Sequence, residues 1–149
     1  MRPVAHSVVE WVHVPMAQVF AFLTSPGRMP DWLPECTGVE YEAPLKRGTR
    51  FTARFGERVT EFEVVDLAAP ATFGWAERGE RTGSKTFFRL EGRGGSTALT
   101  IREVWTPRSL VAWLRGHVRQ KRDVKRRLYA VVERVRNMEA ACKPAVRGV

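Results

Sequence analysis

A long uninterrupted stretch near the C-terminus constrains this chain most. From Arg108 to Ala141 the sequence contains no proline and only one glycine, Gly116. Within this stretch, a stripe of mostly apolar residues recurs at alternate steps of four and three residues, which predicts one amphipathic helix. About 33 helical residues at 1.5 Å each span roughly 50 Å, enough to cross a whole domain. The stripe that defines this helix runs through Leu110, Leu114, His117, Lys121, Val124, Leu128, Val131, Val135 and Met138.

Strands dominate the chain before this helix. Residues 4–14 are rich in valine and predict a strand that Pro15 ends. Residues 16–24 predict a short helix, and SPGRMPDWLP predicts a second helical turn. Six further segments alternate apolar and polar residues between turns, which indicates an antiparallel meander. These segments are 39–43, 49–55, 59–67, 72–77, 85–91 and 97–105.

This order predicts an α+β fold, with two short helices after the first strand and a curved seven-stranded antiparallel sheet wrapped around the long C-terminal helix. The sheet must curl because strands twist, and its concave apolar face must be covered. Only the long helix is large enough to cover it, and a ligand cavity is expected between the two. We expect one domain over residues 1–149, with a frayed tail at 141–149.

Four segments carry a resemblance to a known group of proteins: VHVPMAQVFAFLTSPGRMPDWLP, LKRGTRF, FEVVDLAAPATFGW and STALTIREVW. They resemble the START-like, or helix-grip (SRPBCC), superfamily, which includes bacterial polyketide cyclases and dehydratases. The resemblance implies a lipid, polyketide, quinone-like or hormone-like ligand in the cavity. Some relatives catalyse ring closure or dehydration, and many only bind and deliver. No universal catalytic motif carries over to this sequence.

The residues give no support for a secreted, membrane-spanning, metal-binding or nucleotide-binding protein. The N-terminus lacks the apolar run of a signal peptide, no stretch reaches the roughly 20 apolar residues that span a bilayer, and Cys36 and Cys142 have no metal-ligand spacing. EGRGGS lies between two strands, so it predicts a hairpin turn and no phosphate cradle. We therefore expect a cytoplasmic protein with free thiols, no metal and no cofactor.

His117 and Lys121 occupy successive positions of the apolar stripe, so both are expected to point toward the sheet. One interpretation places them at the cavity, as an imidazole for proton transfer and a cation for a ligand carbonyl or carboxylate. In the other, this half of the helix overhangs the sheet edge and Lys121 reaches solvent.

Glu10 and Glu103 are weak catalytic candidates, as is His117. Each glutamate shares its strand parity with apolar residues, and the first and last strands are neighbours in a helix-grip fold. Two nearby carboxylates in an apolar cavity could act as acid and base. In the alternative, Val9 and Trp11 face inward and Glu10 lies in water beside Arg102.

Aromatic side chains on the strands are expected to line the cavity, with Trp32 near its entrance. Together with His117 and Lys121, the predicted ligand contacts are Tyr41, Phe51, Phe55, Phe62, Phe73, Trp75, Phe88 and Trp105.

The formal net charge is +9, and seven lysines or arginines lie within residues 115–127. Spread around a helix, they predict first a solvated face and second an attraction to an anionic membrane or RNA. Three functions therefore stay open. They are binding or transport of a small hydrophobic ligand, a polyketide cyclase or dehydratase reaction using a cavity acid or base, and docking of the basic helix on RNA, the ribosome or an anionic membrane.

The two halves of the helix predict different mutational effects. Leu128→Ala should lower the free energy of unfolding by about 2–5 kcal/mol, because it leaves a void in the core. His117→Ala should barely change stability but should weaken binding of an apolar fluorophore, because ligand or water is its neighbour. Thermal melts and one binding titration of both variants test this. Equal destabilisation with intact binding in His117→Ala would contradict it.

Overall fold

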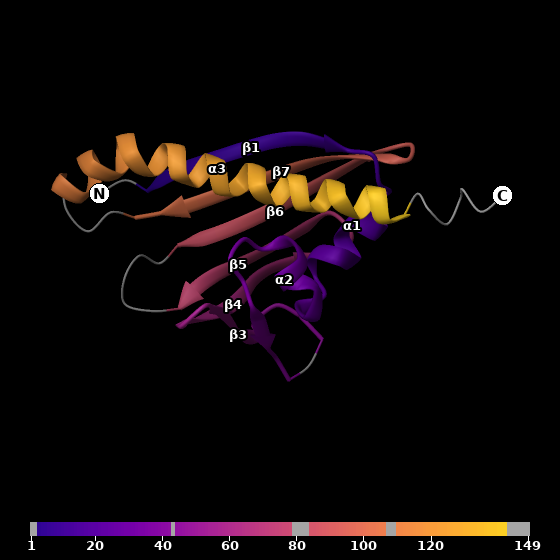
Figure 1. Cartoon of the computed structure of the whole chain (residues 1–149), viewed down its shortest axis with the longest axis horizontal. Helices are drawn as coiled ribbons and strands as arrows, with labels where there is room; N and C mark the ends of the chain where they lie inside the picture. Colours follow the sequence, from indigo (N-terminus) through magenta and orange to yellow (C-terminus); the bar gives the residue numbers. More distant parts are fainter. Residues whose placement is uncertain (1–2, 43, 79–83, 107–109, 143–149) are drawn as a thin grey trace.

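A computed structural model gives the fold in Figure 1. It describes residues 3–42, 44–78, 84–106 and 110–142, and within the last helix it describes the side chains at 111 and 122–138. In chain order the elements are β1 (Val4–Val12), α1 (Met16–Leu23), the 3-10 turn η1 (Pro26–Arg28), α2 (Met29–Trp32), β2 (Gly38–Glu40), β3 (Arg50–Phe55), β4 (Arg58–Ala68), β5 (Thr72–Arg78), β6 (Lys85–Arg93), β7 (Ser96–Trp105) and α3 (Leu110–Cys142).

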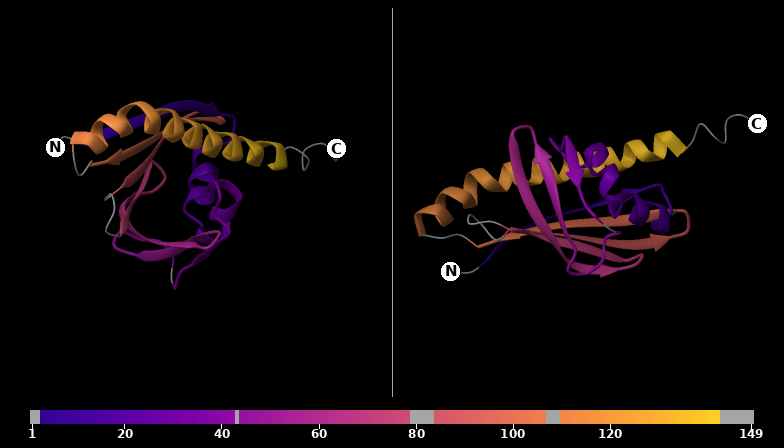
Figure 2. Two further views of the ribbon diagram at one scale, coloured as in Figure 1. Left: turned by 60° about the vertical axis from the view of Figure 1, so that its left-hand side comes forward. Right: turned by 90° about the horizontal axis from the view of Figure 1, so that it is seen from below.

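The seven strands form one antiparallel sheet in the order β1-β7-β6-β5-β4-β3-β2. Strands β2 to β7 pair as successive neighbours, and β1 joins the sheet beside β7. Figure 2 shows the sheet curled around the two short helices, with α3 lying across it. A bulge between Val64 and Asp66 adds to this curl, because an extra residue in one strand bends it. The predicted helix-grip fold is confirmed.

Two predicted strands are shorter than the sequence suggested. β1 ends at Val12, and the carbonyl of Val14 accepts a hydrogen bond from Thr97 Oγ1 at 2.7 Å as the chain turns into α1. β2 ends at Glu40, so Tyr41 lies beyond the ladder. Pro44 follows closely, and a proline cannot donate a ladder hydrogen bond.

The apolar stripe of α3 holds the helix on the sheet. Val124, Leu128, Val131 and Val135 are buried as predicted, and Met138 packs against the same core half-buried. α3 runs along β1 for most of the strand's length (Figure 1). The stripe residues Leu110, Leu114, His117 and Lys121 lie outside the described side chains.

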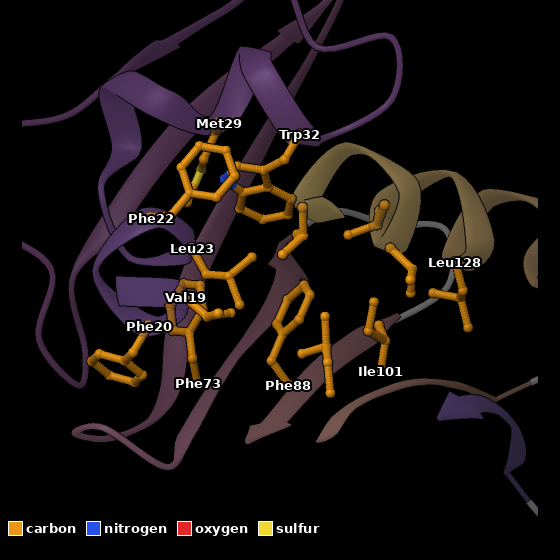
Figure 3. Packing of buried hydrophobic residues seen from close by; sticks show 14 of the residues in the cluster. Val19, Phe20, Phe22, Leu23, Met29, Trp32, Phe73, Phe88, Ile101 and Leu128 are labelled. Carbon is orange, nitrogen blue, oxygen red and sulfur yellow. The ribbon is translucent and has the colours of Figure 1, made fainter. Parts of the chain in front are cut away.

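Aromatic rings fill much of the space inside the curled sheet (Figure 3). Trp32 is fully buried, and its ring centroid lies 5.5 Å from that of Phe88 and 5.9 Å from that of Trp75. The expected position of Trp32 at the cavity entrance is therefore wrong. The Pro26–Trp32 segment turns inward, so the indole ring of Trp32 becomes part of the core and leaves less room for a ligand.

Gly74 provides a test of the packing on the convex face. A Cβ at this position of β5 would lie 2.6 Å from Cδ1 of Phe87 and 3.2 Å from the carbonyl oxygen of Thr86. Gly74→Val should therefore lower the free energy of unfolding by about 1–3 kcal/mol through overpacking. Urea denaturation measures the loss, and adding Phe87→Ala should recover part of it. Gly38→Val is the matched control, because a Cβ at Gly38 meets nothing within 4 Å. An equal loss in both variants would refute the packing argument.

Candidate functional site

A pocket of about 120 Å³ opens between α3 and the concave face of the sheet. Its buried wall is formed by the rings of Phe62 and Trp75. The strands position these rings by the alternation of side chains, which sends every second residue to the concave face. The rest of the lining is more polar: Leu33, Pro34, Glu35, Phe55, Arg58, Thr60, Glu77, Ser84, Thr86, Glu103 and Arg127. An aromatic wall with a charged rim suits a small amphipathic molecule.

The size of this pocket limits what it holds in this conformation. Pockets for drug-sized molecules measure roughly 300–1,000 Å³, whereas an apolar cavity of about 150 Å³ accommodates benzene. Two larger hollows, of about 690 and 460 Å³, are grooves on the outside of the molecule. The first is lined largely by exposed charged residues of β2, β3 and β4. The second lies between α1 and the ends of β2 and β4, so neither enters the space under α3.

Glu103 lies at the mouth of the pocket and joins the sheet to the helix. Its side chain is only 12% exposed, and Nη2 of Arg127 donates to its two carboxylate oxygens at 2.6 and 2.7 Å. Arg127 directly precedes Leu128, so burial of Leu128 brings the guanidinium to the pocket rim. A catalytic role for Glu103 would require the carboxylate to exchange this partner for a substrate.

Glu10 forms a second link between sheet and helix. Its carboxylate accepts a hydrogen bond from Nη2 of Arg136 at 3.1 Å, and Arg136 also bonds the carbonyl of Trp11 and the carboxylate of Glu133. Val9 is 61% exposed and Trp11 is 44% exposed, so these residues face outward. This excludes the alternative in which Val9 and Trp11 point into the core.

The two carboxylates share the concave side but do not form a pair. Glu103 is opposite His6 in the β1–β7 register, and Glu10 is four residues further along β1. At roughly 3.3 Å per residue, this separates them by about 13 Å. The nine residue steps from Arg127 to Arg136 rise by nearly the same distance at 1.5 Å each. The carboxylates therefore serve as two parallel links to α3, and an acid–base dyad between them is excluded by geometry.

Three of the eight predicted aromatic contacts line the pocket: Phe55, Phe62 and Trp75. The other strand aromatics, Phe51, Phe73, Phe88 and Trp105, are buried in the core without lining this pocket. Tyr41 is 46% exposed and borders the two outer grooves instead. The predicted contacts His117 and Lys121 lie outside the described side chains.

Sequence reasoning missed the polar lining on the concave face. Thr60 has the same parity as Phe62, and Thr86 has the same parity as Phe88, so alternation alone could have found both. His6 is buried opposite Glu103 and could have been found by its parity with Val4 and Val8. Arg127 gave no comparable signal, because a basic residue on an exposed helix flank normally lies in water.

Cys36 is a buried free thiol away from the pocket lining. Burial raises the pKa of this thiol, and a hydrogen bond with the backbone of Gly38 opposes that shift only in part. A raised pKa leaves little thiolate at neutral pH, so Cys36 is a poor nucleophile.

Among the described residues, no three histidine, cysteine or acidic side chains are grouped closely enough to hold a metal ion. Within the same part of the chain, no helix combines the length and apolar character needed to cross a bilayer.

A curled antiparallel sheet that holds a long C-terminal helix over an aromatic-walled pocket defines the helix-grip class. The chain belongs to the family described as polyketide cyclase / dehydrase and lipid transport, whose model matches residues 4–136. No curated protein sequence is significantly similar to the chain.

Solved structures share this fold at low sequence identity. The protein MLL2253 from Mesorhizobium loti has a TM-score of 0.74 at 15% identity, with 93% of this chain and 98% of that one covered. The di-domain ARO/CYC StfQ from the steffimycin biosynthetic pathway has a TM-score of 0.74 at 12% identity, with 93% of this chain and 52% of that one covered. DynU16, from the dynemicin biosynthetic locus, has a TM-score of 0.68 at 20% identity, with 94% and 48% covered. The chain thus spans about half the length of StfQ and of DynU16.

The link between Glu103 and Arg127 predicts an asymmetric response to mutation. Arg127→Met leaves a largely buried carboxylate without its partner and should lower the free energy of unfolding by about 1–3 kcal/mol. Glu103→Gln leaves Arg127 free to turn into water and should cost less than about 1 kcal/mol. Thermal melts of the two variants at neutral pH compare these losses. A larger loss for Glu103→Gln would show that the carboxylate does not depend on Arg127.

Proposed function

We propose that this chain binds a small amphipathic molecule, with a ring against Phe62 and Trp75 and a polar group at the mouth of the pocket. The observation that carries the proposal is the pocket itself, in which a buried aromatic wall meets a rim bearing Thr60, Thr86, Glu103 and Arg127. The family match supports a hydrophobic small molecule as the ligand class. Lipid, polyketide and quinone-like molecules all combine an apolar body with polar oxygens.

The pocket volume of about 120 Å³ accommodates little more than one ring. A larger ligand would therefore extend out past the rim or displace α3 from it. Arg127 lies in the path of either movement, since it crosses from α3 to Glu103 at the mouth. In this proposal the link between the two residues opens when the ligand enters, and Arg127 becomes available to a carbonyl or carboxylate of the ligand.

A cyclase or dehydratase reaction is the second candidate. Glu103 favours it, because a largely buried carboxylate at a pocket mouth is suitably placed to move a proton. Against it, Glu10 lies too far from Glu103 to act as a second acid or base. Turnover of a poly-β-ketone substrate by the parent chain separates the two candidates, because a binder should show none. If the parent chain does turn the substrate over, Glu103→Gln should keep ligand affinity within a few-fold and lose that turnover.

Filling the pocket provides the direct test of binding. Thr86→Phe places a ring in the pocket from β6, and it should weaken binding of the probe 1-anilinonaphthalene-8-sulfonate by about tenfold or more, because the added ring competes for the same small volume. Fluorescence titration measures this affinity, and native mass spectrometry of the purified protein should reveal a co-purifying apolar molecule that the variant lacks.

Thr100→Phe is the matched control for this variant. Thr100 is opposite Val9 in the β1–β7 register, so its side chain lies on the convex face, away from the pocket. The control should bind the probe like the parent chain. Equal affinity of Thr86→Phe and Thr100→Phe would place the probe elsewhere and overturn the proposal.

A further inference from the structure

The outer edge of β1 has free backbone groups. Gly94 and Gly95 connect β6 to β7 as a two-residue turn, whose flanking residues Arg93 and Ser96 form a hydrogen-bonded pair. Hydrogen-bonded pairs recur at every second residue of an antiparallel ladder. The backbone groups of even-numbered β7 residues, like Ser96, therefore bond β6, and those of odd-numbered β7 residues bond β1. The even-numbered residues of β1 therefore bond β7, and its odd-numbered backbone groups point away from the sheet.

A hydrogen bond from α3 supports this orientation. Nη2 of Arg136 donates to the carbonyl of Trp11 at 3.1 Å, so the backbone of this odd-numbered residue is accessible from outside the sheet. Within the described part of the chain, no backbone hydrogen bond from another element reaches Ala5, Ser7 or Val9. Unpaired groups of this kind are a template for one more strand.

Basic residues of α3 lie along this edge. Arg122, Tyr129 and Arg136 are spaced by seven residues and therefore share one flank of the helix, with Lys125 beside them. The contacts of Arg136 with Glu10 and Trp11 show that this flank faces β1. From Arg122 to Arg136 the helix rises about 21 Å, and from Ala5 to Trp11 the strand extends about 20 Å. The basic flank thus matches this stretch of β1 in length, and Arg136 reaches the carbonyl of Trp11 at its end.

The two sides of the edge differ in chemistry. On the convex side, Val9 and Trp11 are exposed apolar side chains. On the helix side lie Arg122, Lys125 and the exposed ring of Tyr129. Among the described residues, neither Arg122 nor Lys125 forms an ion pair with an acidic side chain. A strand added here would alternate its side chains between these two environments.

We propose that the β1 edge binds an extended peptide segment in which apolar and acidic residues alternate. The apolar side chains would contact Val9 and Trp11, and the acidic ones would meet Arg122 and Lys125, while the backbone extends the sheet. Charge complementarity selects this partner over a second copy of the chain. Each copy has a formal net charge of +9, so pairing β1 with β1 would bring the two basic flanks together.

The experiment uses a fluorescein-labelled octapeptide of alternating valine and glutamate and the whole protein. Fluorescence anisotropy should show binding that weakens as sodium chloride is raised from about 50 to about 300 mM, since exposed charges are screened. The Arg122→Glu/Lys125→Glu variant should weaken binding by about tenfold or more. Its control, Lys46→Glu/Arg47→Glu, makes the same change in net charge in an exposed loop and should leave affinity within about twofold of the parent.

A second variant tests the backbone contribution. Ser7→Pro removes one outward N–H from the edge, and it should weaken binding although proline is tolerated on edge strands. Equal binding of a valine–lysine octapeptide, or equal losses in the two charge-reversal variants, would overturn the proposal. A dimer in sedimentation that requires Ser7 and Val9 would show that a second copy occupies the edge. Binding to phosphatidylserine vesicles through Arg122 and Lys125, without peptide binding, would show that the partner is a membrane.

Discussion

The long helix α3 is held on the β1–β7 side of the curled sheet by a seam of buried apolar side chains. Val124, Leu128, Val131, Val132 and Val135 are buried there. Burying apolar side chains of this size contributes on the order of 1.5–3 kcal/mol each. An arginine on each flank of this apolar seam forms an ion pair with a glutamate of the sheet. Arg127 pairs with Glu103, and Arg136 pairs with Glu10. The seam fixes the position and rotation of the helix, and that rotation brings the two arginines within reach of the glutamates.

This placement of the helix also determines the pocket. Because α3 follows β1 and β7, it leaves the space near β3, β4 and β5 to the short helices, and Trp32 occupies much of that space (Figures 2 and 3). What remains is a small pocket between the Trp32 segment, the sheet and the Arg127 flank of α3. The same rotation that directs Arg127 to the pocket rim directs Arg136 to the free edge of β1. One helix thus borders both the pocket that we propose for a small molecule and the edge that we propose for a peptide.

Alternation and helical periodicity predicted most of the fold, because both follow from which face of an element is buried. The buried residues of the α3 seam came from these patterns. Parity grouped Glu10 with Val8 and Val12, and Glu103 with Leu99 and Ile101, but it left open which face of the first strand is buried. The distance between the two glutamates could not be predicted, because it depends on the β1–β7 register, which a single sequence leaves undefined. The position predicted for Trp32 was wrong for a similar reason. The sequence PDWLP predicts a turn, but the direction in which that turn folds depends on the size of the space beneath it.

The space under α3 is where we propose that a small aromatic ligand binds, and the groove lined by Phe20, Pro26, Leu45 and Leu67 is the main competing location. The most direct measurement is a titration of isotopically labelled protein with 1,4-naphthoquinone, followed by chemical-shift changes. Binding under α3 should give the largest changes at Phe62, Trp75, Thr86 and Glu103, with little change at Leu45 and Leu67. Changes confined to the outer groove, with none at Trp75 or Thr86, would contradict it.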